Sequence, residues 1–159
     1  MVRLYARSLK GSRTQGPKPN KRGRNVSIIG SISVNEVLTL VNLIGTTDAI
    51  TFEVFIIRKL VPQLWKGACV VMENCTIHTG EEVEKAITKK RGKLIYLSPY
   101  LPDFSPIENL WSKFKNILRS IKTTNSQELA KAIEFAFNEI TSENIGNWFT
   151  HCCYCTSSL

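Results

Sequence analysis

Two acidic residues follow predicted strands at the edge where the functional sites of parallel sheets lie. The short apolar run Ala68–Met72 ends directly in Glu73, and the run Leu94–Leu97 leads through a proline-rich loop to Glu108. We expect both carboxylates at one rim of the sheet, where they could hold a hard divalent cation, which prefers oxygen ligands. The pair therefore predicts metal-assisted phosphoryl transfer. Ordinary surface acids, at a strand end and in the first turn of a helix, are the alternative.

Basic residues accompany Glu108 along one face of its predicted helix. Ser112, Lys115, Arg119 and Lys122 follow it at spacings of three or four residues, which places them on the same side. Such a row could hold a metal at its start and follow a phosphate backbone beyond it. A solvated face, which any surface helix has, is the other interpretation.

The positive charge of the chain is concentrated near its N-terminus. The 159 residues have a formal net charge of +8, and residues 1–35 carry eight Lys or Arg and no Asp or Glu. Such a segment attracts polyanions, which favours nucleic acid over a merely solvated basic tail. Residues 1–24 are rich in Gly, Pro, Lys and Arg and are expected to form an arm or loop. Its candidate DNA contacts are Arg13, Lys18, Lys21, Arg22 and Arg24.

The composition is that of one folded domain, with 43% hydrophobic and 21% charged residues. No run approaches the roughly 18 apolar residues of a membrane span, and no apolar stretch follows the N-terminal arginines as a secretory signal would require. Five cysteines, two of them adjacent, do not predict a disulfide framework and suit a reducing cytoplasm. The cluster His151–Cys155 lacks the separated ligand pairs of a zinc site.

Hydrophobic periodicity predicts the elements that must position these residues. Strands are expected over Val26–Val34, Val37–Ile44, Ala68–Met72 and Leu94–Leu97, the last two buried on both faces. Helices are expected from Thr47 or Asp48 to about Leu60, from a capping box at Thr79–Glu82 to about Lys90, from Pro106 to Ile121, from Asn125 or Ser126 to about Ile140, and over residues 142–151. This alternating order predicts an α/β sheet with parallel pairing.

Two blocks of sequence carry a resemblance to a known family. Residues 71–78 read VMENCTIH, and residues 97–111 read LSPYLPDFSPIENLW. Both resemble the catalytic core of mariner-type DDE transposases, the enzymes of many bacterial insertion sequences. The match runs in register from roughly Arg7 to Trp148. The 34 residues between Glu73 and Glu108 are similar to the spacing in the family.

The resemblance implies an RNase H-like fold, a mixed sheet flanked by helices, and DNA cleavage with strand transfer. It implies a divalent metal, Mg²⁺ or Mn²⁺, held by three acidic residues, of which Glu73 and Glu108 match two. Asn74, His78 and Asn109 are possible supports, and His78 could instead cap the following helix. The implied partner is DNA, and the implied location is the bacterial cytoplasm, in association with the nucleoid.

The chain departs from the family pattern at its first two acids. Glu73 stands where Asp is usual, and no acidic residue precedes Glu36, so none matches the first catalytic Asp on the central strand. We expect an N-terminally truncated transposase that is inactive alone, with a core over residues 25–151 that lacks this strand and a tail over residues 152–159. It would pair with itself or with a complementing N-terminal fragment. The alternative is a non-catalytic remnant that binds DNA without sequence preference.

Overall fold

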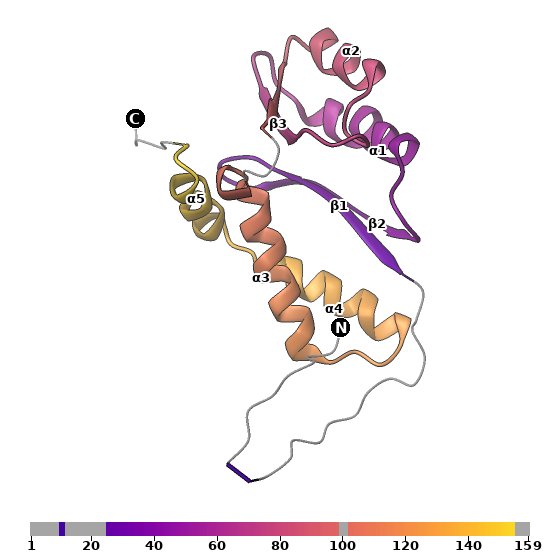
Figure 1. Ribbon diagram of the computed structural model, residues 1–159, viewed down its shortest axis with the longest axis vertical. Helices are drawn as coiled ribbons and strands as arrows, with labels where there is room; N and C mark the ends of the chain where they lie inside the picture. The colour runs from indigo at the N-terminus through magenta and orange to yellow at the C-terminus, as the bar shows by residue number, and fades with distance from the viewer. Residues whose placement is uncertain (1–9, 12–24, 99–101, 155–159) are drawn as a thin grey trace.

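The computed structural model describes residues 10–11, 25–98 and 102–154 (Figure 1). Apart from residues 10–11, the predicted basic arm lies outside the described residues, and so do its candidate contacts Arg13, Lys18, Lys21, Arg22 and Arg24. In the part that is described, no helix is long and apolar enough to cross a membrane.

A β-hairpin lies between two layers of other elements. Its strands β1 (Val26–Ile32) and β2 (Val37–Ile44) are antiparallel, and Ile29 lies opposite Val41. Because side chains alternate along a strand, Ile29 packs into one apolar core while Ile28 packs against the other. Figure 1 shows the hairpin between α1 and α2 on one side and α3 and α4 on the other.

The second strand pair carries the first candidate carboxylate. Strands β3 (Cys69–Glu73) and β4 (Lys93–Leu97) are parallel, as predicted, and α2 (Glu81–Lys89) connects them. The expectation that both are buried on two faces is wrong, because Val71 is 37% exposed and Ile95 48% exposed. Their neighbours Val70 and Leu94 pack into the core with α1 and α2, so only one face of this sheet is covered.

The two strand pairs remain separate sheets. Among the described residues, β1 bonds only to β2, and β3 only to β4. Both pairs nevertheless contribute to one core, which contains Ile29 of β1 and Val70 of β3. Within the described residues, each pair therefore has strand edges that bond to no other strand.

The first helix begins as predicted but ends differently. The Asp48 carboxylate accepts a hydrogen bond from the Thr51 amide at 2.8 Å, and hydrogen bonds from the side chain and the amide of Thr51 lower the pKa of Asp48. From Asp48, α1 (Ala49–Phe55) continues through a π-helical turn (Ile56–Leu60) and a 3₁₀ turn (Val61–Gln63). The predicted end at about Leu60 is where the π-helical turn ends, and the 3₁₀ turn that follows contains Pro62, because a proline near the start of a turn loses no hydrogen bond.

The predicted capping box before α2 is absent. Gly80, not Thr79, occupies the N-cap position, and no side chain caps the helix there. The Thr79 hydroxyl donates instead to the carbonyl of Thr76 at 3.4 Å, because the preceding turn brings that carbonyl within reach. Acidic residues in the first turn still suit the helix dipole.

Three helices form the layer on the other side of the hairpin. They are α3 (Pro106–Ile121), α4 (Ser126–Asn138) and α5 (Ser142–His151). Asn125, one of the two residues predicted to start this helix, caps α4. Its Oδ1 accepts a hydrogen bond from the Glu128 amide at 2.8 Å. Hydrogen bonds from Thr124 to the Glu128 carboxylate lower the pKa of Glu128. The predicted apolar stripe of α3 buries Leu110, Phe114 and Leu118.

We expect Gly30→Ala to destabilise the protein and Gly146→Ala to stabilise it. A Cβ at Gly30 would lie 3.1 Å from Leu40 Cδ1 and 3.2 Å from Trp111 Cη2, whereas one at Gly146 would meet nothing within 4 Å. The expected cost at Gly30 is about 1–3 kcal/mol. The expected gain in the interior of α5 is about 0.5–1 kcal/mol. Urea unfolding measures both, and a Gly30→Ala variant as stable as wild type would contradict this packing.

Candidate active site

Glu73 lies at the carboxyl end of β3, and its side chain is exposed. The chain turns sharply after it, with hydrogen bonds from the Cys75 amide to the Glu73 carbonyl at 3.0 Å and from the His78 amide to the Cys75 carbonyl at 2.9 Å. This turn fixes the backbone from which the carboxylate projects. Asn74, the predicted support beside it, is exposed.

His78 closes the turn that follows Glu73. Its Nδ1 donates to the Glu73 carbonyl at 3.0 Å, and its ring stacks on Phe52 of α1 with centroids 4.3 Å apart. The Tyr96 hydroxyl of β4 donates to the His78 carbonyl at 3.3 Å. Of the two predicted roles, His78 therefore contacts Glu73, and the cap of α2 belongs to Gly80.

Glu108 lies in the first turn of α3, and its side chain is half-buried. Its amide donates to the carbonyl of Ser105 at 3.0 Å, and Ser105 is a buried polar residue at 6% exposure. The neighbouring Asn109 turns toward α5, where its amide nitrogen donates to the Cys152 sulfur at 3.7 Å. The predicted support at Asn109 thus contacts a thiol that holds α5 to this turn.

The two carboxylates belong to elements that adjoin in the chain. Parallel pairing places Glu73 opposite Leu97, and the chain continues from there to a 3₁₀ turn (Pro102–Phe104) and then to α3. Both carboxylates are oxygen donors, the type that a hard divalent cation prefers. Across the described residues, however, no group of three or more His, Cys, Asp or Glu side chains could hold a metal ion. The donor type fits such a metal, and the donor number is one short of the expected three.

Ser112, Lys115 and Arg119 of the predicted basic row lie on α3, whereas Lys122 directly follows the last helical residue in a left-handed conformation with φ 53°. Lys115 and Lys122 are exposed and Arg119 is half-buried; Arg119 Nη1 donates to Asn116 Oδ1 at 3.2 Å. Both ion pairs found in the described part involve Lys85 on α2, so this row is not neutralised by acids there. These cations remain available to an anionic partner.

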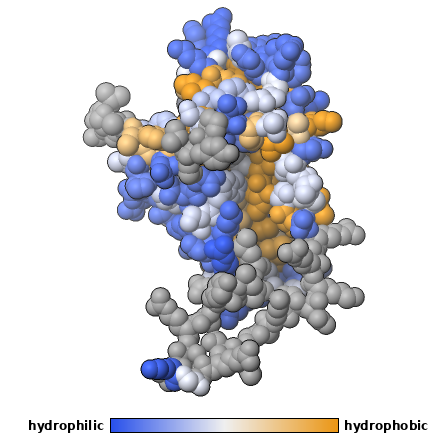
Figure 2. Space-filling model, viewed as in Figure 1, coloured by the Kyte–Doolittle hydropathy of each residue, from blue (hydrophilic) through white to orange (hydrophobic). Residues whose placement is uncertain are grey.

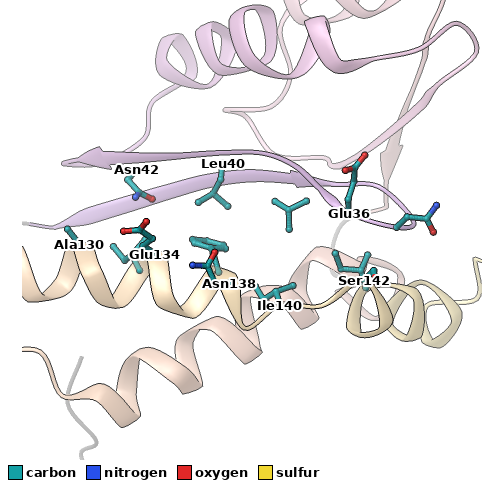
Figure 3. A pocket seen from close by; sticks show the side chains of 13 residues that line it. Glu36, Leu40, Asn42, Ala130, Glu134, Asn138, Ile140 and Ser142 are labelled. Carbon is teal, nitrogen blue, oxygen red and sulfur yellow. The ribbon is translucent and has the colours of Figure 1, made fainter.

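A groove that the sequence did not reveal lies between β2 and α4 (Figure 3). Its volume is about 810 Å³. Figure 2 shows apolar side chains gathered between the hairpin and α4, and Figure 3 shows Glu36 and Glu134 beside them. With these two acids and no basic residue, the groove does not suit a polyanion. It is lined by Asn35, Glu36, Val37, Leu40, Asn42, Ala130, Ile133, Glu134, Phe137, Asn138, Ile140, Ser142 and Ile145.

Comparison with known proteins identifies the family. The model of the DDE superfamily endonucleases matches residues 1–130, so the chain belongs to this family. It is 23% identical over 130 residues to the transposable element Tcb1 transposase of Caenorhabditis briggsae, a match that covers 79% of this chain and 48% of that protein. The chain thus spans about half the length of this relative.

Solved structures show the same fold. The Mos1 transposase paired-end complex with left transposon end has a TM-score of 0.74 at 15% identity, over 96% of this chain and 47% of that chain. The Mos1 transposase catalytic domain with Raltegravir and Mg has a TM-score of 0.64 at 13% identity, over 79% of this chain and 68% of that chain. The expected RNase H-like fold of a mariner transposase catalytic domain is thereby confirmed.

We expect Tyr96→Phe to change how stability depends on pH. Burial raises the pKa of Tyr96 above its usual 10.0, and the nearby Glu84 carboxylate raises it further. The folded chain therefore holds this proton more tightly than the unfolded chain does. The stability due to Tyr96 is fully present below pH 10 and is lost as the pH rises through the folded-state pKa.

Urea unfolding of wild type and Tyr96→Phe at pH 8, 9, 10 and 11 (chosen to span about the usual tyrosine pKa) measures this effect. Wild type should be the more stable at pH 8, because it keeps the hydrogen bond to His78, and the gap should narrow above pH 10. A gap that stays constant across the series would contradict the raised pKa.

Proposed function

We propose that this chain is the catalytic part of a transposase from a bacterial insertion sequence, and that Glu73 and Glu108 are its surviving metal ligands. The observation that carries the proposal is the position of these carboxylates in a DDE fold. One ends β3, and the other opens α3. The family membership makes DNA cleavage and strand transfer the reaction class that best fits this pair.

The metal of this site would be Mg²⁺ or Mn²⁺. Glu73 and Glu108 supply only carboxylate oxygens, and no thiol or imidazole is needed, which favours a hard cation over zinc. A divalent ion bound there would polarise a phosphodiester oxygen for attack. The Mos1 catalytic domain, whose structure was determined with Mg, has the same fold. With two carboxylates instead of three, we propose that this chain binds the metal weakly.

The second ligand position carries a longer side chain than the family resemblance leads one to expect. Glu73 places its carboxylate one methylene farther from β3 than Asp would, and an error of about 1 Å in a positioned site can cost about 100-fold in rate. The turn after Glu73 is held by His78, so the backbone has little freedom to retract. This mismatch adds to the lack of a third ligand among the described residues as a reason for the low activity that we propose.

The partner that would complete the site is a segment that supplies both a strand and an acid. Among the described residues, each strand pair has edges that bond to no other strand, and these edges offer backbone hydrogen bonds to such a segment. We propose that it comes from a complementing N-terminal transposase fragment, or from a second copy of the chain in a homodimer. An apolar strand ending in Asp would supply both the strand and the third acidic ligand.

DNA would lie along the basic row of α3. Lys115 and Arg119 follow Glu108 on that helix, and Lys122 directly follows its last residue; none of the three is paired with an acid in the described part. We propose that the arm of residues 1–24 adds phosphate contacts, and that the protein acts on the nucleoid in the bacterial cytoplasm. A non-catalytic DNA-binding remnant is the second candidate, favoured by the lack of a three-ligand group among the described residues.

For the metal site, we expect weak Mn²⁺ binding that depends on both carboxylates. Glu108→Gln and Glu73→Gln should each weaken Mn²⁺ binding about tenfold or more, because each removes a charged ligand. Glu134→Gln, which changes an acid of the β2–α4 groove, is the matched control and should leave the affinity unchanged. Electron paramagnetic resonance of free Mn²⁺ measures all four affinities.

Nicking of supercoiled plasmid in Mg²⁺ then separates the two candidate functions. The chain alone should nick little, because the described residues supply two of the three expected carboxylate ligands. Strong Mg²⁺-dependent nicking that disappears in Glu108→Ala would contradict the expected inactivity and support the enzyme. If wild type, Glu73→Gln and Glu108→Gln bind Mn²⁺ with equal affinity, the proposed metal site is excluded and the non-catalytic DNA-binding function is supported.

For DNA, we expect Lys115→Gln combined with Arg119→Gln to weaken duplex binding and to reduce its salt dependence. If each residue neutralises one phosphate, the slope of log affinity against log salt should fall by about two. The control is Lys66→Gln combined with Lys131→Gln, two exposed lysines off this row, with the same change in net charge. Fluorescence anisotropy at several salt concentrations measures the slopes, and equal slopes for both double variants would exclude α3 as the contact.

A further inference from the structure

The chain reverses direction at the end of α5 and returns to the start of α3. Cys153 adopts a left-handed conformation with φ 63°, and amide hydrogen bonds from Cys152 to Trp148 and from Tyr154 to Phe149 close the helix end. The reversal sets the Tyr154 ring edge-on to Phe149, with centroids 5.7 Å apart. The packed part of the chain therefore reaches Tyr154, beyond the last helical residue.

The side chains of Tyr154 and Cys152, in this reversal, contact residues on either side of Glu108 in the sequence. The Tyr154 hydroxyl donates to the carbonyl of Phe104 at 3.0 Å, across 50 residues of sequence. Cys152, only 2% exposed, accepts from the Asn109 amide nitrogen at 3.7 Å. Phe104 ends the 3₁₀ turn before α3, and Asn109 directly follows Glu108, so the two contacts hold both sides of the turn that carries the carboxylate.

The chemistry of the two groups suits a permanent contact. Burial raises the pKa of the Cys152 thiol, so it stays neutral near pH 7 and accepts a hydrogen bond without adding a charge beside Glu108. Burial also raises the pKa of Tyr154, which keeps its hydroxyl a donor. Ser105 and Pro106, between the two contacts, are buried as well, so the whole turn is fixed.

We propose that Tyr154 and Cys152 are positioning residues for Glu108, which set the place of its carboxylate through the backbone of the first turn of α3. This inference rests on the proposed metal site and adds a part of the chain that none of its predicted site residues includes. Tyr154 acts on Phe104, and Cys152 acts on Asn109; neither touches the metal. Loss of either contact frees the turn while α5 keeps its other attachment to α3.

That other attachment provides a matched control. Lys113 Nζ of α3 donates to the carbonyl of Glu139, at the end of α4, at 2.8 Å and to Asn144 Oδ1 in the first turn of α5. Lys113→Met removes contacts between the same helical layer and α3 without touching residues 104–109. A merely structural role for Tyr154 predicts that Tyr154→Phe and Lys113→Met behave alike.

The experiment measures Mn²⁺ affinity and amide hydrogen exchange in wild type, Tyr154→Phe, Cys152→Ala, Lys113→Met and Glu108→Gln. We expect Tyr154→Phe and Cys152→Ala to weaken Mn²⁺ binding about tenfold, as loss of a supporting contact does at metal sites. We expect the amides of residues 107–110 to exchange about tenfold faster in these two variants. Lys113→Met should leave both quantities at the wild-type value.

The two readouts separate this inference from the function on which it rests. If wild type and Glu108→Gln bind Mn²⁺ equally, the proposed metal site is excluded. Faster amide exchange at residues 107–110 in Tyr154→Phe, without the same change in Lys113→Met, would even then support the positioning of the turn. If Tyr154→Phe leaves exchange and affinity unchanged, the positioning role is overturned. Equal losses in Tyr154→Phe and Lys113→Met would likewise overturn it, since they indicate general packing.

Discussion

The packing of α3 against the hairpin is the contact on which the candidate site depends. Trp111 lies over Gly30 of β1, where any Cβ would come within 3.2 Å of its ring. One turn farther on, Phe114 meets the Trp111 ring edge-on at 6.2 Å and stacks on Phe137 of α4 at 4.4 Å. These aromatic contacts fix α3 between the hairpin and α4, and Glu108, three residues before Trp111, is placed with it.

The hairpin also links the positions of the two carboxylates, because its two faces pack into two different cores. Ile29 packs with α1, α2 and β3, while Ile28 packs with α3 and α4. The first core determines where β3 ends, and so where Glu73 lies. The second determines where α3 begins. The separation of the two carboxylates is therefore set through one strand, β1, and a change in its register would move both.

The local sequence pattern predicted the helices and strands well, but it predicted their burial and their long-range contacts less well. The stripe of α3 and the caps at Asp48 and Asn125 depend on residues within a turn of each other, so the sequence predicts them. Val71 and Ile95 were expected to be buried, because their strands look the same whether one face is covered or two. The contact of Tyr154 with Phe104 joins residues 50 apart, and no local pattern predicts such a pair.

Each candidate carboxylate is supported from outside its own element, and this argues that the pair has a function. Glu73 is the last residue of β3, and its own backbone carbonyl is held by His78, which Phe52 and Tyr96 contact in turn. Glu108 opens a helix whose first turn is held by side chains from the end of α5. An ordinary surface acid at a helix start or a strand end needs no such support, because water stabilises its carboxylate equally well in any rotamer. Fixing a backbone costs conformational entropy, and two separate sets of contacts oppose that cost at the two carboxylates that we propose as metal ligands.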